Sequence, residues 1–326
     1  MPSDPLQVPF SSAVALQSSS SKRLPTTFRA RGQPLQNTKD NIEEFLSCEL
    51  RTTRLDEVHQ HLWLAGLPRP AHPLHRQVSF GRRILISEDP DEHLTWHHSY
   101  NNTFVFIKPL PEFLLDYEFW KDELCKNLAL HKSACGLLLS YAWLIGHRSD
   151  LKIAHKESLV PESITWEAWL KFMEAFMSYI GDPDLQTHVD RRYAYGDLRI
   201  SRLNSLYRFG YAGWSLHKLV HGFMSGSTRY TAFFESNFGW MLAVFVYLSV
   251  VLSAMQVALA TDRLGKDDSF QGFSYGFSLL SISIVLGAIF LIFLVWVSLF
   301  WFHLLSTKQY CKGVAARREK KELEKA

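Results

Sequence analysis

Two long apolar segments near the C-terminus constrain this chain more than any other feature. Residues 238–260 and 277–305 contain no Asp, Glu, Lys or Arg. A helix needs about 20 apolar residues to cross the roughly 30 Å hydrocarbon core of a bilayer, and each segment is longer than that. We therefore expect an integral membrane protein in which both segments are transmembrane helices, because a helix satisfies its own backbone polar groups in lipid.

The connection between the two segments, residues 261–276, is long enough for a turn and too short for a domain. We therefore expect a transmembrane helical hairpin. A hydrogen bond from Gln256 to Ser278 or Ser281 would join the two helices. Small residues would let the helices approach closely, and they are Ser249, Ser253, Ser283 and Gly287.

Basic residues are distributed unevenly around the two segments. The connection carries Arg263 and Lys266 against three Asp, whereas residues 306–326 carry seven Lys or Arg. Because cytosolic flanks of membrane helices are enriched in Lys and Arg, we expect both termini in the cytosol. Residues 230–237 would be juxtamembrane, 261–276 a non-cytosolic loop, and 306–326 a basic cytosolic tail. A glycosylation sequon at 101–103 would then stay unmodified.

The remaining chain divides into a polar N-terminal stretch and a longer mixed region. Residues 1–40 are rich in Ser, Pro, Gln and Thr and have no apolar period, so we expect them to be disordered. A secretory signal is not expected there, while a mitochondrial transit peptide stays open because basic residues outnumber acidic ones. Residues 41–229 are long enough for one globular domain with its own core, which we place in the cytosol.

Patterns within residues 41–229 predict a domain with helices and a small β-hairpin. Strands are expected at 83–87 and 103–108, with a turn at 100–102. Helices are expected at 41–50, 56–64, 111–132, 133–147, 161–180 and 197–208. The fold class expected for the chain is thus mainly α: a cytosolic α+β domain followed by a C-terminal two-helix transmembrane hairpin.

Two of these helices carry most of the expected core. The apolar run within 133–147 is too short to span a bilayer, so it is expected to fill a core. The helix at 161–180 is amphipathic and should end at Gly181. One face is expected to be buried, formed by Trp166, Trp169, Leu170, Met173, Phe176, Met177 and Ile180.

Longer stretches of the sequence resemble a known group of proteins. They read FIKPLPEFLLDYEFW at 106–120, LLLSYAWLI at 137–145, RYAYGDLRISRLNSLYR at 192–208, and VLSAMQVALATDRL at 251–264. Together they resemble an uncharacterised family of fungal two-span membrane proteins over residues 55–305. The chain departs from the family pattern at His72 and Asp197, where Arg and Glu are typical, which weakens the case for an ion pair at position 72. The resemblance implies architecture and no particular chemistry.

Arginine and tyrosine alternate over residues 191–208. Guanidinium groups bind phosphates in a bidentate manner, and a membrane tether would hold them near lipid headgroups. The candidate contacts with anionic lipid are Arg192, Arg199, Arg202 and Arg208. A solvated basic face, partly paired with Asp190 and Asp197, is the simpler interpretation and is favoured over lipid contact.

Histidines and cysteines are also candidate functional residues. Seven histidines fall within forty residues: His59, His61, His72, His75, His93, His97 and His98. Without a nearby Cys pair or a His-Glu-x-x-His motif, separate histidines are favoured over a zinc site, and no metal or cofactor is expected. Cys48, Cys125 and Cys135 show no framework spacing, and Cys311 is a candidate for lipidation or a plain thiol.

No motif predicts a reaction. Gly272, Ser274 and Gly276 match the Gly-x-Ser-x-Gly nucleophile elbow, but no strand precedes them, so we do not expect an enzyme. The layout also resembles the CorA-like divalent-cation channels, whose Gly-Met-Asn signature is replaced by Ala254-Met255-Gln256. We therefore expect a membrane-anchored interaction or scaffold protein near anionic lipid, with an unknown protein partner and no nucleic acid. A CorA-like transporter is the alternative.

Overall fold

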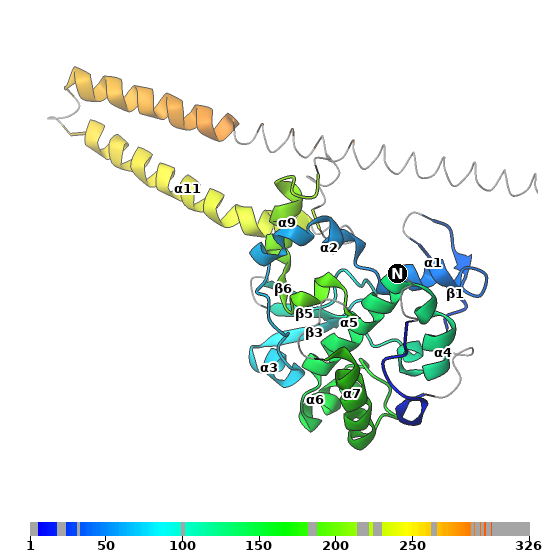
Figure 1. Ribbon diagram of the computed structural model, residues 1–326. Coiled ribbons are helices and arrows are strands. Elements are labelled where there is room, and N and C mark those ends of the chain that lie inside the picture. Colours follow the sequence, from blue (N-terminus) through cyan, green and yellow to red (C-terminus); the bar gives the residue numbers. More distant parts are fainter. Residues whose placement is uncertain are drawn as a thin grey trace, which may run out of the picture. The chain divides into compact units, whose positions relative to one another are not determined.

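The computed structural model describes residues 6–17, 24–30, 33–98, 102–181, 188–213, 222–223, 230–261 and 266–287, together with Phe290, Leu294, Val297 and Trp301. The chain divides into two units, Met1–Thr228 and Arg229–Ala326, which we call the N-terminal and C-terminal units. Helices dominate both, with small sheets in the N-terminal unit, as the sequence predicted. The helices of the N-terminal unit gather around its larger sheet (Figure 1).

The larger sheet has four strands in the order β3-β5-β4-β6. These are β3 (Arg82–Ile86), β4 (Thr95–His98), β5 (Thr103–Ile107) and β6 (Leu198–Arg199). The two expected strands, now β3 and β5, are neighbours, but they are parallel, with Ile84 opposite Val105. The hairpin is formed instead by β4 and β5, which are antiparallel. The expected pairing was wrong because β4, with its sequence TWHH, is too short and polar to stand out as a strand.

Helix α5 (Leu128–Leu144) forms the centre of the main core, as expected of its apolar run. Asn127 caps its first turn by accepting hydrogen bonds from the backbone N–H groups of Ala129 and Leu130. Gly136 lets η6 (Arg191–Ala194) pack closely, because an added Cβ would lie 2.1 Å from the Tyr193 ring. By composition, α5 and the following α6 (Arg148–Lys156) could form a broken span, but a bend of 114° separates them.

The expected helix at 111–132 is wrong, because three short helices precede α5. They are η4 (Glu112–Leu115), α4 (Tyr117–Asp122) and η5 (Leu124–Lys126). Asp116 starts α4 by accepting the N–H groups of Glu118 and Phe119. The caps at Asp116 and Asn127 each begin a new helix. They thus divide the segment that periodicity alone predicted to be one helix.

Helix α7 (Trp166–Ile180) starts later than expected, at the Thr165 cap, and ends at Gly181 with φ of 65°. Phe172 is buried, whereas the expected core residues Leu170 and Met177 are exposed. The buried face is therefore rotated from the expected one and consists of Trp169, Phe172, Met173, Phe176 and Ile180.

A second, smaller core lies where α9 (Ile200–Arg208) packs against β4 and η3 (His59–Leu64). It contains Leu62, Leu203 and Phe223. The other helices among the described residues of this unit are η1 (Ser12–Val14), α1 (Ile42–Leu50), α2 (Thr53–Glu57) and α3 (Leu74–Ser79). Two of the described α-helices, α3 and α6, were not expected from the sequence, and α3 packs against α6 and β3.

The expectation of disorder over residues 1–40 was wrong for the part that the structure describes. Strands β1 (Thr27–Phe28) and β2 (Gln36–Asn37) pair there. Phe10 is buried, and its ring lies 4.7 Å from that of Phe172. Phe28 contacts Phe45 at 5.6 Å. Individual aromatic residues anchor this polar stretch to the core. Its overall composition does not reveal them.

The C-terminal unit contains two helices that are long and apolar enough to cross a membrane. The first is α11 (Tyr230–Leu259), and the second covers Asp268–Gly287, with Phe290, Leu294, Val297 and Trp301 also helical. The second helix starts earlier than the expected residue 277, so the expected loop at 261–276 is shortened. The segment with the apparent nucleophile elbow lies within this helix. The expected tail at 306–326 lies outside the described residues.

The expected contact between Gln256 and Ser281 is not found. Ser281 is buried, as is Ser274 two turns earlier, but Gln256 is exposed. The half-buried residues of α11 form a different stripe at helical spacing: Leu248, Val251, Leu252, Met255 and Ala258. The small residues expected at the contact are exposed: Ser249, Ser253, Ser283 and Gly287.

Candidate functional site

The four arginines singled out in the sequence have different surroundings. Arg192 is 1% exposed, and burial lowers the pKa of its guanidinium. Its Nη1 donates to the carbonyl oxygen of Tyr195, and its Nη2 donates to that of His93 at 2.8 Å. Arg192 therefore ties η6 to the residues before β4, and the expectation that it contacts lipid was wrong.

Arg199 lies on β6, half-buried, with its guanidinium 5.1 Å from the centre of the Trp96 ring. Arg82 also lies over this ring, at 4.8 Å. Cation–π contacts of this kind hold a guanidinium against the sheet. Arg199 is thus a packing residue as well as a charge, which makes it a poorer lipid contact than the sequence indicated.

Arg202 and Arg208 are exposed on α9. This helix buries Ile200, Leu203, Leu206 and Tyr207 on one side. Its other side exposes Ser201, Arg202, Ser205 and Arg208. Arg202 Nη1 donates to the carbonyl oxygen of Leu64 at 3.2 Å, which links α9 to the end of η3. These two arginines keep their charges at the surface.

Exposed aromatic residues accompany the two arginines. Phe209, directly after α9, is 73% exposed, and Trp63 in η3 is 59% exposed. The Tyr211 ring lies 4.6 Å from that of His61, so the chain after α9 also meets η3. We call the surface formed by Trp63, Arg202, Arg208, Phe209 and Tyr211 the α9 face. Arginine forks suit phosphate groups, and aromatic rings suit the membrane interface.

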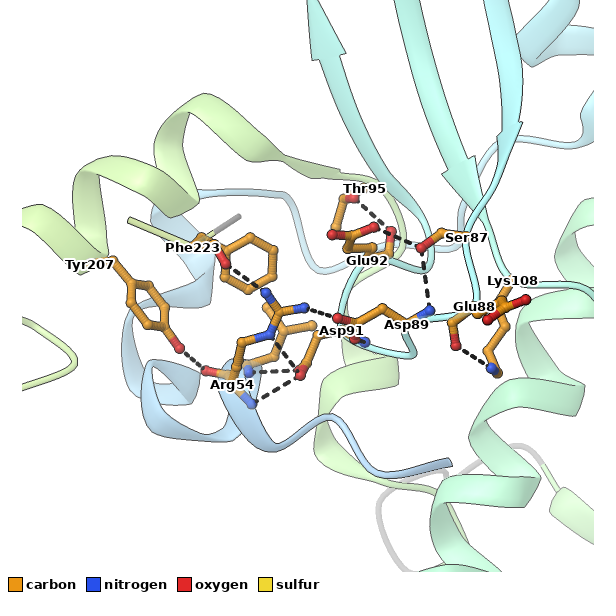
Figure 2. A network of polar contacts seen from close by, with 11 residues as sticks. Arg54, Ser87, Glu88, Asp89, Asp91, Glu92, Thr95, Lys108, Tyr207 and Phe223 are labelled. Atoms are coloured by element: carbon orange, nitrogen blue, oxygen red, sulfur yellow. Dashed lines mark hydrogen bonds and ion pairs between the residues drawn. The ribbon is translucent and has the colours of Figure 1, made fainter. Parts of the chain in front are cut away.

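A buried network around Arg54 fixes the segments next to the α9 face, as Figure 2 shows. Arg54 Nε donates to Asp91 Oδ2 at 3.1 Å, and Nη2 bonds to Asp89. Asp91 Oδ1 also accepts the backbone N–H of Leu55 at 3.0 Å. Burial alone would lower the pKa of the Arg54 guanidinium, but Asp89 and Asp91 outweigh it and raise that pKa.

The same network reaches the last described residues before α11. Arg54 Nη1 donates to the Phe223 carbonyl at 2.6 Å, and its guanidinium lies 4.7 Å from the Phe223 ring centre. The Tyr207 hydroxyl on α9 donates to the Arg54 carbonyl. These contacts join α2, α9 and residue 223, so they fix the end of the N-terminal unit that precedes α11 in the sequence. This role is structural.

The seven histidines considered as candidate zinc ligands do not form one cluster. His93 is fully buried, with Nδ1 accepting the Lys108 N–H at 3.0 Å and Nε2 donating to Ser140 Oγ at 2.7 Å. Burial lowers its pKa well below the usual range, so it is a neutral core residue. His75 alone among the seven joins a set of possible metal ligands, together with His147 and Asp150. Sequence spacing missed this set because α3 and α6 are distant in the chain.

His72 and Asp197, the two departures from the family pattern, are partners. His72 Nδ1 lies 2.6 Å from Asp197 Oδ2. Gln77 Nε2 donates to Asp197 Oδ1 at 3.1 Å, and Arg82 lies 3.4 Å from Oδ2. The sequence put an ion pair at position 72 in doubt, and the structure shows His72 in direct contact with the Asp197 carboxylate.

The cysteines add no site to the described part of the chain. Cys135 is buried, and burial raises its thiol pKa, so it stays protonated. Burial also raises the pKa of Cys125. Cys48 is exposed. Cys311, the lipidation candidate, lies outside the described residues.

Comparisons with known proteins identify a family and assign no activity. A comparison with curated proteins and one with solved structures found no significant match. One family model matches residues 42–285, which include the N-terminal unit's sheet, α9, α11 and most of the second apolar helix. One family model thus covers most of the N-terminal unit together with the apolar helices. The chain belongs to the family of unknown function DUF6601.

Proposed function

We propose that this chain is a membrane-anchored interaction or scaffold protein whose N-terminal unit contacts anionic lipid from the cytosol. The two apolar helices would insert as a hairpin, because each is long enough to cross the hydrocarbon core. The proposed role is binding rather than catalysis.

The observation that carries the proposal is the α9 face. It presents Arg202 and Arg208 beside the exposed rings of Trp63, Phe209 and Tyr211. Only 21 residues separate residue 208 from α11, so a bilayer that holds α11 would lie within reach of this face. Near an anionic leaflet each arginine contributes about 1 kcal/mol, and the rings would lie at the headgroup level.

The interaction half of the proposal has weaker support, from a second surface. The exposed apolar side chains here include Val78 on α3, Phe80 directly after it, and Ile86 on β3. Helix α3 packs against β3. Exposed apolar side chains on two neighbouring elements are a candidate surface for a protein partner. Affinity capture from mild detergent, comparing the native chain with Phe80→Ser, tests this. Identical sets of captured proteins would contradict a role for this surface.

Vesicle binding tests the lipid contact directly. The N-terminal unit, residues 1–228, should bind vesicles that contain phosphatidylserine at low salt and dissociate as salt is raised. Arg202→Gln together with Arg208→Gln should weaken binding about 30-fold, at ~1 kcal/mol for each charge. Arg76→Gln, an exposed arginine on α3, is the matched control and should bind normally.

Two results would contradict the proposal. Binding that is equally strong to uncharged vesicles, or unchanged in the double variant, would leave α9 as a solvated basic helix. Selective Mg²⁺ flux through the full-length protein in sealed liposomes would instead favour a divalent-cation transporter, although the usual signature is replaced by Ala254-Met255-Gln256.

A further inference from the structure

The start of α3 and the start of α6 bring two histidines and one carboxylate together. His75 is the second residue of α3, His147 directly precedes α6, and Asp150 lies in the first turn of α6. One possible ligand atom from each residue lies within 4.8 Å of the other two. Because α3 packs against α6, residues 72 positions apart in the chain meet at one point.

Asp150 is held in place by backbone groups from both sides. It is fully buried, and its Oδ1 accepts the backbone N–H of His75 at 2.7 Å. Its Oδ2 accepts the backbone N–H of His147 at 2.9 Å. A carboxylate oriented by two fixed donors resembles the supported ligands of metal sites, whose outer contacts fix the position of the inner ones.

The two imidazoles face the same carboxylate. His75 Nδ1 lies 2.8 Å from Asp150 Oδ1, and His147 Nδ1 lies 3.4 Å from Oδ2. The rings are nearly perpendicular, with centres 5.1 Å apart. A distance of 3.4 Å is long for an N–H···O hydrogen bond. Ligand atoms about 2.1 Å from a tetrahedral Zn²⁺ are ~3.4 Å apart, so the 2.8 Å contact of His75 would open by roughly half an ångström if His75 Nδ1 and Asp150 Oδ1 both bound the ion.

We propose that His75, His147 and Asp150 bind a divalent transition-metal ion, with Zn²⁺ as the first candidate. Imidazole ligands favour Zn²⁺ over Mg²⁺ and Ca²⁺, which take oxygen ligands. The His75 and His147 side chains are 39% and 69% exposed, so an ion can enter from solvent and a water molecule can complete its coordination. The site lies entirely within the N-terminal unit and does not depend on membrane anchoring.

Metal titration of the full-length protein tests the proposal. The protein is purified in mild detergent without a polyhistidine tag, stripped of metal, and titrated with Zn²⁺ against a chromophoric chelator. About one Zn²⁺ should bind for each chain, and His75→Ala or His147→Ala should each weaken binding at least tenfold. Excess Mg²⁺ should not displace the Zn²⁺. Co²⁺ should give visible absorption bands with the native chain that both variants lose.

A matched control separates this site from general histidine binding. His98→Ala removes an exposed histidine of β4, whose Nδ1 lies 2.8 Å from Thr103 Oγ1, and should leave Zn²⁺ binding unchanged. Both site histidines are partly exposed, so metal-free variants should melt at the native temperature. Equal Zn²⁺ affinity in the native chain and both variants, or no Zn²⁺ binding by the folded native chain, would overturn the assignment. Displacement of the bound Zn²⁺ by excess Mg²⁺ would contradict the assignment of the site to a transition metal.

Discussion

Individual residues of the same type have opposite roles in this chain, and burial decides between them. Arg192 and Arg208 are both part of one basic stretch, yet the first is 1% exposed and bonded to carbonyls while the second lies at the surface. No local pattern distinguishes them, because the carbonyl that Arg192 binds at His93 is 99 positions away. The sequence could therefore predict a basic stretch but not which of its arginines are free to bind a ligand.

His93 illustrates the same limit and leads to a prediction about pH. Its folded-state pKa is lowered, first by burial and then by Arg192 and Lys108. Below pH ~6.5 the unfolded chain binds a proton at this residue that the folded chain does not bind. The free energy of unfolding should therefore fall as pH decreases from about 6.5, by up to ~1.4 kcal/mol for each pH unit, until the folded residue also titrates.

Chemical denaturation of residues 1–228 between pH 5 and pH 8 measures this dependence. His93→Gln keeps one acceptor for the Lys108 N–H and one donor for Ser140 Oγ. Its unfolding free energy should fall less steeply below pH 6.5 than that of the native chain. Some slope should persist, because burial also lowers the pKa of His131. An unchanged slope would mean that His93 is not the group that titrates.

Helices that carry their own signal were predictable, and elements defined by distant partners were not. The apolar run of α5 and the periodicity of α7 indicated both helices correctly. Strands β4 and β6 have four and two residues and exist because β5 and β4 pair with them. The parallel pairing of β3 with β5 likewise depends on tertiary contacts that outweigh local propensity.

Gly136 tests how closely η6 packs on α5. Alanine favours a helix interior by up to ~1 kcal/mol over glycine, but a Cβ at this position would lie 2.1 Å from the buried Tyr193 ring. We expect Gly136→Ala to lower the unfolding free energy by about 1–3 kcal/mol, the usual cost of overpacking. Gly146→Ala is the control, with nothing within 4 Å of its added Cβ. Denaturant midpoints of residues 1–228 compare them, and a stabilised Gly136→Ala would contradict the packing.

The half-buried stripe of α11 and the buried Ser281 give a second prediction at this scale. Ser281 is 3% exposed, so Ser281→Leu should overpack the contact and destabilise the pair by about 1–3 kcal/mol. Gln256→Leu, on the exposed side of α11, should have little effect. Thermal unfolding of the full-length protein in mild detergent distinguishes the two substitutions. The reverse order would restore Gln256 as the residue that joins the helices.

At the scale of the whole molecule, one chain combines a unit that has a buried core with a pair of exposed apolar helices. The family match runs from α1 into the second apolar helix, so it covers most of the N-terminal unit together with the apolar pair. Apolar helices that are exposed along most of their length need lipid or another apolar environment. The N-terminal unit buries its own core and needs none. The proposed membrane anchor would satisfy both parts.

Thiol labelling in sealed microsomes tests the proposed orientation of that anchor. Cys48 is an exposed native thiol of the N-terminal unit, and Lys266→Cys adds one in the connection between the helices. With both termini cytosolic, a membrane-impermeant maleimide should label Cys48 in intact microsomes and position 266 only after permeabilisation. Peptide mass spectrometry reads each position separately. Labelling of position 266 with protection of Cys48, or a sugar on Asn101, would invert the topology and remove the cytosolic lipid surface from reach of the α9 face.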